Sequence, residues 1–157
     1  TGNGHIFAEG GKTVDDGGQG IDFLQLVTSD PMKAGMQNVD IIFSNWQMSP
    51  VDGMMLLRWV RRHKESPNRF IPFVMVTGYA DREKVREARA MGATEMLAKP
   101  FSVVNLGQRL LQVVNRPRKF VHTNKYFGPD RRRNQKEIPP GKDRRKNDER
   151  NIEVVHV

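Results

Sequence analysis

The chain has 157 residues, contains no cysteine and carries a formal net charge of +8. The lack of cysteine excludes a disulfide framework and a thiolate site. The sequence has no apolar run long enough to cross a membrane and no secretory signal pattern at its start, so we predict a cytoplasmic protein without a membrane partner.

The first half of the chain predicts a helix, a strand and a second helix. The apolar residues of 19–26 fit a short helix with one apolar face, and the apolar run 40–44 fits a strand that is buried on both sides. Asp52 is a suitable N-cap for the next helix. The apolar side chains of that helix recur at helical spacing: Met55, Leu56, Trp59 and Val60.

The pattern continues with two more strands and two more helices. Residues 70–78 form a second apolar run, and the polar helix that follows begins at Asp81 and stops at Gly92. Residues 94–100 predict a third strand, and residues 103–115 a last helix. Alternating strands and helices of this kind predict an α/β fold, a parallel sheet with helices on both faces.

Three polar residues stand at the carboxyl ends of the three predicted strands: Asn45, Thr77 and Lys99. Taken singly, the lysine reads as a surface residue and the threonine as a helix cap. Because the carboxyl ends of parallel strands meet at one edge of the sheet, the three together predict a site in that crevice.

The C-terminal tail, residues 116–157, differs in composition from the rest of the chain. It holds 13 basic and 6 acidic residues, whereas residues 1–115 hold 13 basic and 12 acidic. Its few apolar residues cannot offset a backbone ordering cost of about 1–2 kcal/mol per residue, so we expect a disordered tail that is dispensable for folding. A motif of the form GxDRR[RK]N occurs twice in it, thirteen positions apart.

Three motifs carry a family resemblance: "DIIFSNWQMSPVDG", "FVMVTGYA" and "GATEMLAKPFS". In this order they resemble the receiver domain of two-component response regulators, which has a flavodoxin-like fold. The resemblance covers residues 12–115, preceded by an atypical segment, 1–11. It implies that Asn45 stands at the phosphoacceptor position, with Thr77, Lys99 and a cis-proline, Pro100, as the phosphate-site equivalents.

Asparagine at the acceptor position predicts a receiver that is not phosphorylated and not an enzyme. The resemblance also implies an acidic pair that holds Mg²⁺, and Asp15 and Asp16 are poor candidates because a glycine-rich turn follows them at once. We therefore expect no cofactor and no metal. Asn45 is either natural or an introduced block, and the start of the chain is either natural or the start of a fragment.

The resemblance implies partners in a phosphorelay, such as a histidine kinase or another signalling protein. We expect these partners on an interaction face formed by Arg82, Arg86, Arg89, Met96, Val104 and Arg109. A plain solvated helix surface is the alternative.

The family's first strand has no counterpart in the chain, so another strand must pair with the strand edges that its absence leaves open. The segment "HIFAE" could supply a strand, the C-terminal "IEVVHV" could insert, or a second copy could contribute one. Unpaired strand edges and uncovered Ile41 and Phe43 favour a homo-oligomer that forms through this gap and through the face around residues 103–115.

The alternative function is nonspecific binding of nucleic acid or of an acidic partner through the tail. The basic residues for this role form two clusters, Arg131, Arg132, Arg133 and Arg144, Arg145, Lys146. Phe120, Tyr126 and Phe127 would then be available to stack on bases.

Overall fold

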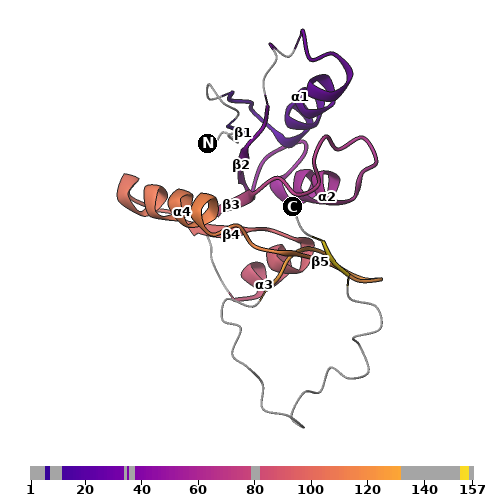
Figure 1. The fold of residues 1–157 in the computed structure, drawn as a ribbon. Coiled ribbons are helices and arrows are strands. Elements are labelled where there is room, and N and C mark those ends of the chain that lie inside the picture. The colour runs from indigo at the N-terminus through magenta and orange to yellow at the C-terminus, as the bar shows by residue number, and fades with distance from the viewer. Residues whose placement is uncertain are drawn as a thin grey trace.

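A computed structural model describes residues 6–7, 12–33, 35, 38–78, 82–131 and 153–155. Its main sheet contains β1 (Ile6–Phe7), β2 (Ile41–Asn45), β3 (Phe73–Thr77) and β4 (Glu95–Ala98), in this spatial order (Figure 1). β2, β3 and β4 run parallel, and β1 runs antiparallel to β2. The predicted α/β fold with a parallel sheet is therefore confirmed.

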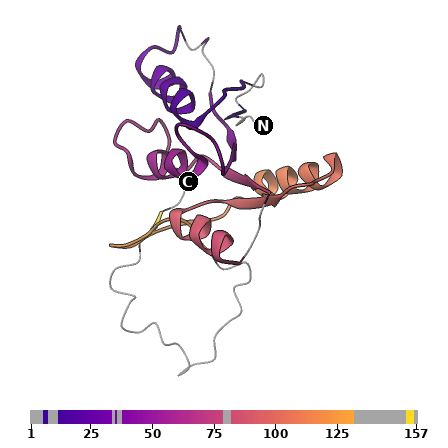
Figure 2. The same ribbon diagram turned by 180° about the vertical axis from the view of Figure 1, so that it is seen from behind.

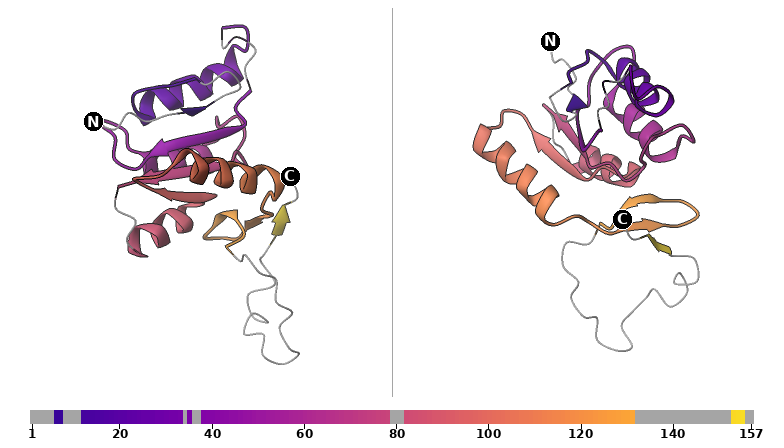
Figure 3. Two further views of the ribbon diagram at one scale, coloured as in Figure 1. Left: turned by 90° about the vertical axis from the view of Figure 1, so that its left-hand side faces the viewer. Right: turned by 45° about the horizontal axis from the view of Figure 1, so that its top comes forward.

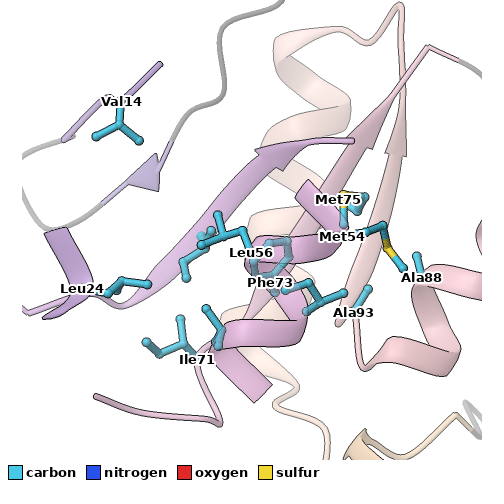
Figure 4. Close-up of a cluster of buried hydrophobic side chains, with 12 residues drawn as sticks. Val14, Leu24, Met54, Leu56, Ile71, Phe73, Met75, Ala88 and Ala93 are labelled. Carbon is cyan, nitrogen blue, oxygen red and sulfur yellow. The ribbon is translucent and has the colours of Figure 1, made fainter. Parts of the chain in front are cut away.

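Four helices cover the two faces of this sheet. α1 (Gly17–Ser29), α2 (Gly53–Arg62) and α3 (Arg82–Met91) lie on one face, and α4 (Val103–Asn115) lies on the other (Figure 3). Successive residues of a strand point to opposite faces. Accordingly, Ile42, Phe73 and Met75 join the larger core cluster under α1, α2 and α3 (Figure 4), whereas Phe43 and Val74 pack on the α4 side.

The ends of the helices follow their sequence signals. The carboxylate of Asp52 accepts a hydrogen bond from the Met55 amide at 2.8 Å, and the Ser102 hydroxyl accepts one from Asn105 at 3.1 Å. Gly92 ends α3 with a φ of +104°, which favours glycine. The last helix matches its predicted range of 103–115, and the predicted start of α3 at Asp81 lies outside the described residues.

The edge of the main sheet decides between the two segments of the chain that could supply the additional strand. Ile6 and Phe7, from the segment "HIFAE", pair with Ile42 and Ile41 of β2. The insertion of "IEVVHV" into this sheet is wrong, since β7 (Glu153–Val155) pairs with another strand, β5, in a second sheet. Phe43 is buried and Ile41 is half-buried, so the expectation that they are uncovered is also wrong.

The tail contains a folded hairpin, which corrects the expectation of disorder for residues 116–131, whereas residues 132–152 lie outside the described part of the chain. β5 (Phe120–His122) pairs antiparallel with β6 (Phe127–Pro129), and β7 pairs with the other side of β5. This second sheet lies beside α3, as Figures 1 and 2 both show. The composition of the whole tail suggested disorder because its few apolar residues are counted together with many charged ones. A few aromatic side chains close together in the sequence are nevertheless enough to anchor a short hairpin to the domain.

Those aromatic side chains pack against the main domain. Phe120 and Phe127 are only 4% and 7% exposed, and both make edge contacts with Phe70, at centroid distances of 5.1 and 5.4 Å. A Cβ at Gly92 would lie 2.9 Å from the Phe127 carbonyl oxygen, so glycine permits the close approach of the hairpin to the end of α3. The hairpin is thus part of the folded unit.

Candidate functional site

The parallel register brings the three polar strand-end residues to one edge of the sheet. Asn45 pairs in register with Val76, and Thr77 pairs with Ala98. The Trp46 amide donates to the Val76 carbonyl at 2.7 Å and the Lys99 amide donates to the Thr77 carbonyl at 2.8 Å, so each loop leaves its strand in a defined direction. The strand ends therefore form one site.

The site is a small cavity of about 180 Å³, which we call the Asn45 cavity. It is lined by Asn45, Gln47, Val76, Thr77, Gly78 and Lys99. Asn45 and Thr77 are 8% and 5% exposed, and Lys99 is exposed at the rim. Pro100 follows the lysine through a cis peptide bond, as the resemblance implies, but does not line the cavity.

Sequence reasoning missed three residues of this cavity: Gln47, Val76 and Gly78. Gln47 lies two positions after Asn45 in the loop to α2, and its place directly after a strand end was the available signal.

The backbone beneath Asn45 is tightly packed. The Ser44 hydroxyl donates to the Asn45 carbonyl at 3.1 Å, and the Gly53 amide donates to the Trp46 carbonyl at 3.0 Å. A Cβ added at Gly53 would lie only 2.2 Å from the Asn45 carbonyl oxygen. Glycine is therefore required where the loop turns back into α2, and the packing holds Asn45 in place.

The cavity does not fit a Mg²⁺ ion. Its side chains offer amide, hydroxyl and ammonium groups, whereas magnesium sites in proteins use carboxylates. The Asp16 carboxylate caps α1 by accepting from the Gly18 amide at 2.6 Å and the Gln19 amide at 3.2 Å. The described part of the chain contains no group of three side chains of the types that bind metals.

The members of the predicted interaction face lie in different environments. Arg82, Arg86 and Arg89 are exposed on α3, and Val104 is exposed on α4. Met96 is half-buried and packs against the larger core cluster, so it contributes little to a surface.

Arg109, the remaining member of that face, belongs to an ion-pair network around a buried carboxylate. It lies 3.5 Å from Glu95, which also pairs with Arg118 at 2.9 Å. Arg109 thus holds α4 against the edge strand β4, and Arg118 ties the start of the tail to the same strand.

The basic clusters of the tail lie mostly outside the described residues: Arg132, Arg133, Arg144, Arg145 and Lys146. Arg131 is described, and its guanidinium lies 4.3 Å from the centroid of the Tyr126 ring. Phe120 and Phe127 are buried against the main domain. The expectation that these two rings are available to stack on bases is therefore wrong.

No helix in the described ranges combines the length and the apolar character needed to span a bilayer.

Comparison with known proteins agrees with this geometry. A family model described as "Response regulator receiver domain" matches residues 10–111. Chemotaxis protein CheY-3 of Vibrio cholerae is 30% identical over 77 residues, which cover 49% of this chain and 58% of that protein. A probable chemotaxis protein CheY of Rhizobium etli is 28% identical over 94 residues, 60% of this chain and 66% of that protein. The chain thus spans less than two thirds of either relative.

Solved structures show the same fold. Chemotaxis response regulator CheY4 of Vibrio cholerae is similar with a TM-score of 0.51 and 29% identity, covering 65% of this chain and 75% of that one. A response regulator in red light signalling of R. palustris has a TM-score of 0.53 at 20% identity, covering 65% of this chain and 72% of that one. The second similarity concerns the fold alone.

Proposed function

Because the chain belongs to the response regulator receiver domain family, we propose that it is a receiver-type signalling module that acts through protein contacts and accepts no phosphoryl group. The observation that carries this proposal is that Asn45, which the family resemblance puts at the acceptor position, is buried in the cavity that Thr77 and Lys99 also line. The proposed role is binding and not catalysis.

The chemistry of the cavity supports this proposal. Phosphoryl transfer to a side chain needs an anionic oxygen nucleophile and a cation that neutralises the developing charge. The Asn45 amide carries no charge, and its nitrogen donates hydrogen bonds where a carboxylate would accept them. Thr77 and Lys99 supply a hydroxyl and an ammonium group at the cavity, but no carboxylate lines it to hold a metal ion.

Partner binding is proposed for the exposed sides of α3 and α4. Arg82, Arg86 and Arg89 form a basic row on α3, which suits an acidic surface on a histidine kinase or another signalling protein. Arg109 is tied to Glu95, and so we propose a structural role for it within this surface.

Intact-mass spectrometry after incubation with acetyl phosphate and Mg²⁺ tests the absence of phosphorylation. We expect no phosphate adduct. Asn45→Asp alone should also give little adduct, because the cavity then holds a single carboxylate and no acidic pair for the cation that screens phosphoryl charge. A stoichiometric adduct on the natural chain that disappears in Asn45→Ala would refute the proposal.

Nucleic-acid binding through the tail is the weaker alternative. Burial of Phe120 and Phe127 removes two of the three aromatic rings that it would use, and Arg131 lies against the third, Tyr126. Binding of single-stranded DNA that falls steeply between low and physiological salt would favour this alternative over signalling.

A further inference from the structure

A groove lies between α1 and α2, away from the Asn45 cavity. It has a volume of about 380 Å³ and is lined by Ile21, Val51, Met55, Arg58, Trp59, Arg62 and His63. The two helices lie side by side in every view, as Figures 1 and 3 show. None of the lining residues also lines the Asn45 cavity, so the α1–α2 groove is a separate feature of the surface.

The register of α2 explains why this groove is apolar at its base. Leu56, Leu57 and Val60 are buried in the core, whereas Met55, Arg58, Trp59 and Arg62 follow one another at i, i+3, i+4 and i+7 and lie along the groove. Met55 is 55% exposed, and it lines the groove together with the half-buried apolar side chains Ile21, Val51 and Trp59. The base of the groove is therefore apolar surface that the fold leaves accessible.

The rim of the groove is positively charged. Arg58 and Arg62 are exposed, and within the described ranges neither forms an ion pair. His63 stacks on Trp59 with a centroid distance of 5.2 Å. Among the lining residues, His63 lies 4.0 Å from the carboxylate of Glu65, which also accepts a hydrogen bond from Gln25 at 2.7 Å. The two guanidinium groups thus remain available for an external anion.

We infer that the α1–α2 groove binds a short acidic peptide segment of a partner protein, with a large apolar side chain of that segment against Met55 and Trp59 and its carboxylates facing Arg58 and Arg62. Tryptophan and arginine are the residues most often found at the energetic centre of protein interfaces, and methionine adapts to varied apolar partners. The guanidinium fork also matches carboxylate geometry in two contacts at once.

The observations favour an acidic peptide over other occupants. The chain's own tail is rich in arginine and lysine, so its charge has the same sign as the rim. Nucleic acid would satisfy the arginines and stack a base on Trp59, but it would leave the aliphatic side chains Ile21, Val51 and Met55 without an apolar partner. A peptide that combines apolar and acidic residues matches both parts of the groove.

The test uses the full chain and a panel of synthetic peptides in which leucine, phenylalanine or tryptophan stands among aspartate and glutamate. Nuclear magnetic resonance follows the Trp59 indole N–H and the Met55 methyl group during titration at physiological salt. We expect at least one peptide of the panel to bind saturably with shifts centred on these two groups. Poly-glutamate and a single-stranded DNA are the competing probes, and both should bind much more weakly.

Two variants and one matched control decide the outcome. Arg58→Glu combined with Arg62→Glu should weaken peptide binding by about tenfold or more, because it reverses the charge of the rim. Met55→Asp should also weaken peptide binding, because it places a charge among the apolar side chains of the groove. Arg116→Glu combined with Lys119→Glu changes the net charge equally at exposed positions beyond α4, and should leave the affinity unchanged.

Three results would overturn the inference. One is the absence of saturable binding by every peptide of the panel. Another is DNA or poly-glutamate binding as tightly as the best peptide, which would reduce the groove to a nonspecific anion site. The last is an equal loss of affinity in the control pair, which would show that net charge alone governs binding.

Discussion

At the scale of single residues, Arg61 shows how the domain and the hairpin are connected. Its side chain is fully buried in α2 and donates to the carbonyl groups of Gly92 at 2.9 Å, Arg69 at 2.8 Å and Ile71 at 2.7 Å. Its guanidinium also lies 5.2 Å from the centroid of the Phe120 ring. Burial lowers the pKa of Arg61 to about 9, so the group stays charged at neutral pH.

Arg61→Met should therefore lower the free energy of unfolding by about 3 kcal/mol, because it leaves two buried carbonyl groups and one part-buried carbonyl group without their donor. Arg62→Met, on the exposed side of the same helix, should change it by no more than about 0.5 kcal/mol. Urea denaturation of the two variants measures the difference. Equal stabilities would show that water or neighbouring groups replace the guanidinium at little cost.

At the scale of secondary-structure elements, the hairpin of β5 and β6 extends the core beyond the last helix. Phe70, Phe120 and Phe127 form a small aromatic cluster, and the Arg69 guanidinium lies 3.8 Å from the centroid of the Phe127 ring. The Tyr126 hydroxyl donates to the Pro129 carbonyl at 2.7 Å and closes the hairpin end. These contacts overturn the expectation that the whole tail is dispensable for folding.

Truncation after Asn115 should thus destabilise the protein strongly, since it removes both buried phenylalanine side chains of the hairpin and exposes Arg61. Truncation after Arg131 retains Phe120 and Phe127 and should cost much less. The single change Phe127→Ala should cost about 3–5 kcal/mol. Thermal unfolding followed by circular dichroism compares the three variants, and matching midpoints for the two truncations would contradict the role given to the hairpin.

At the scale of the whole molecule, the apolar surface of α4 suggests how copies of the chain associate. Val103, Val104, Leu111 and Val114 are between 62% and 85% exposed, on a helix that covers its face of the sheet alone among the described helices. Since β1 lies beside β2 and Phe43 is buried, the sheet edge no longer carries the argument for self-association. The homo-oligomer remains a prediction, now placed on α4.

Light scattering across a wide concentration range should report a species larger than the monomer. Val104→Asp combined with Leu111→Asp should shift the population to the monomer, because two charges on this face oppose its burial. Gln108→Asp combined with Gln112→Asp adds the same charge at polar positions of α4 and should leave the association intact. A natural chain that stays monomeric at high concentration would exclude this contact.

The sequence by itself determined the order and type of the elements from α1 to α4 and the residues at the strand ends. The apolar runs, the cap at Asp52 and Gly92 are local signals, and local geometry alone suffices to place helices and strands from them. The convergence of Asn45, Thr77 and Lys99 also followed, because parallel strands always bring their carboxyl ends to one edge.

Only the tertiary structure decided the features that depend on contacts distant in sequence. The burial of Phe120 and Phe127 depends on Phe70 and Arg61, which lie at least fifty positions earlier in the chain and which no local composition reveals. The exposure of Met55 depends on how α1 packs beside α2, although its apolar character and helical spacing are typical of a core residue. Periodicity shows which residues share a face, but only packing determines whether that face is covered.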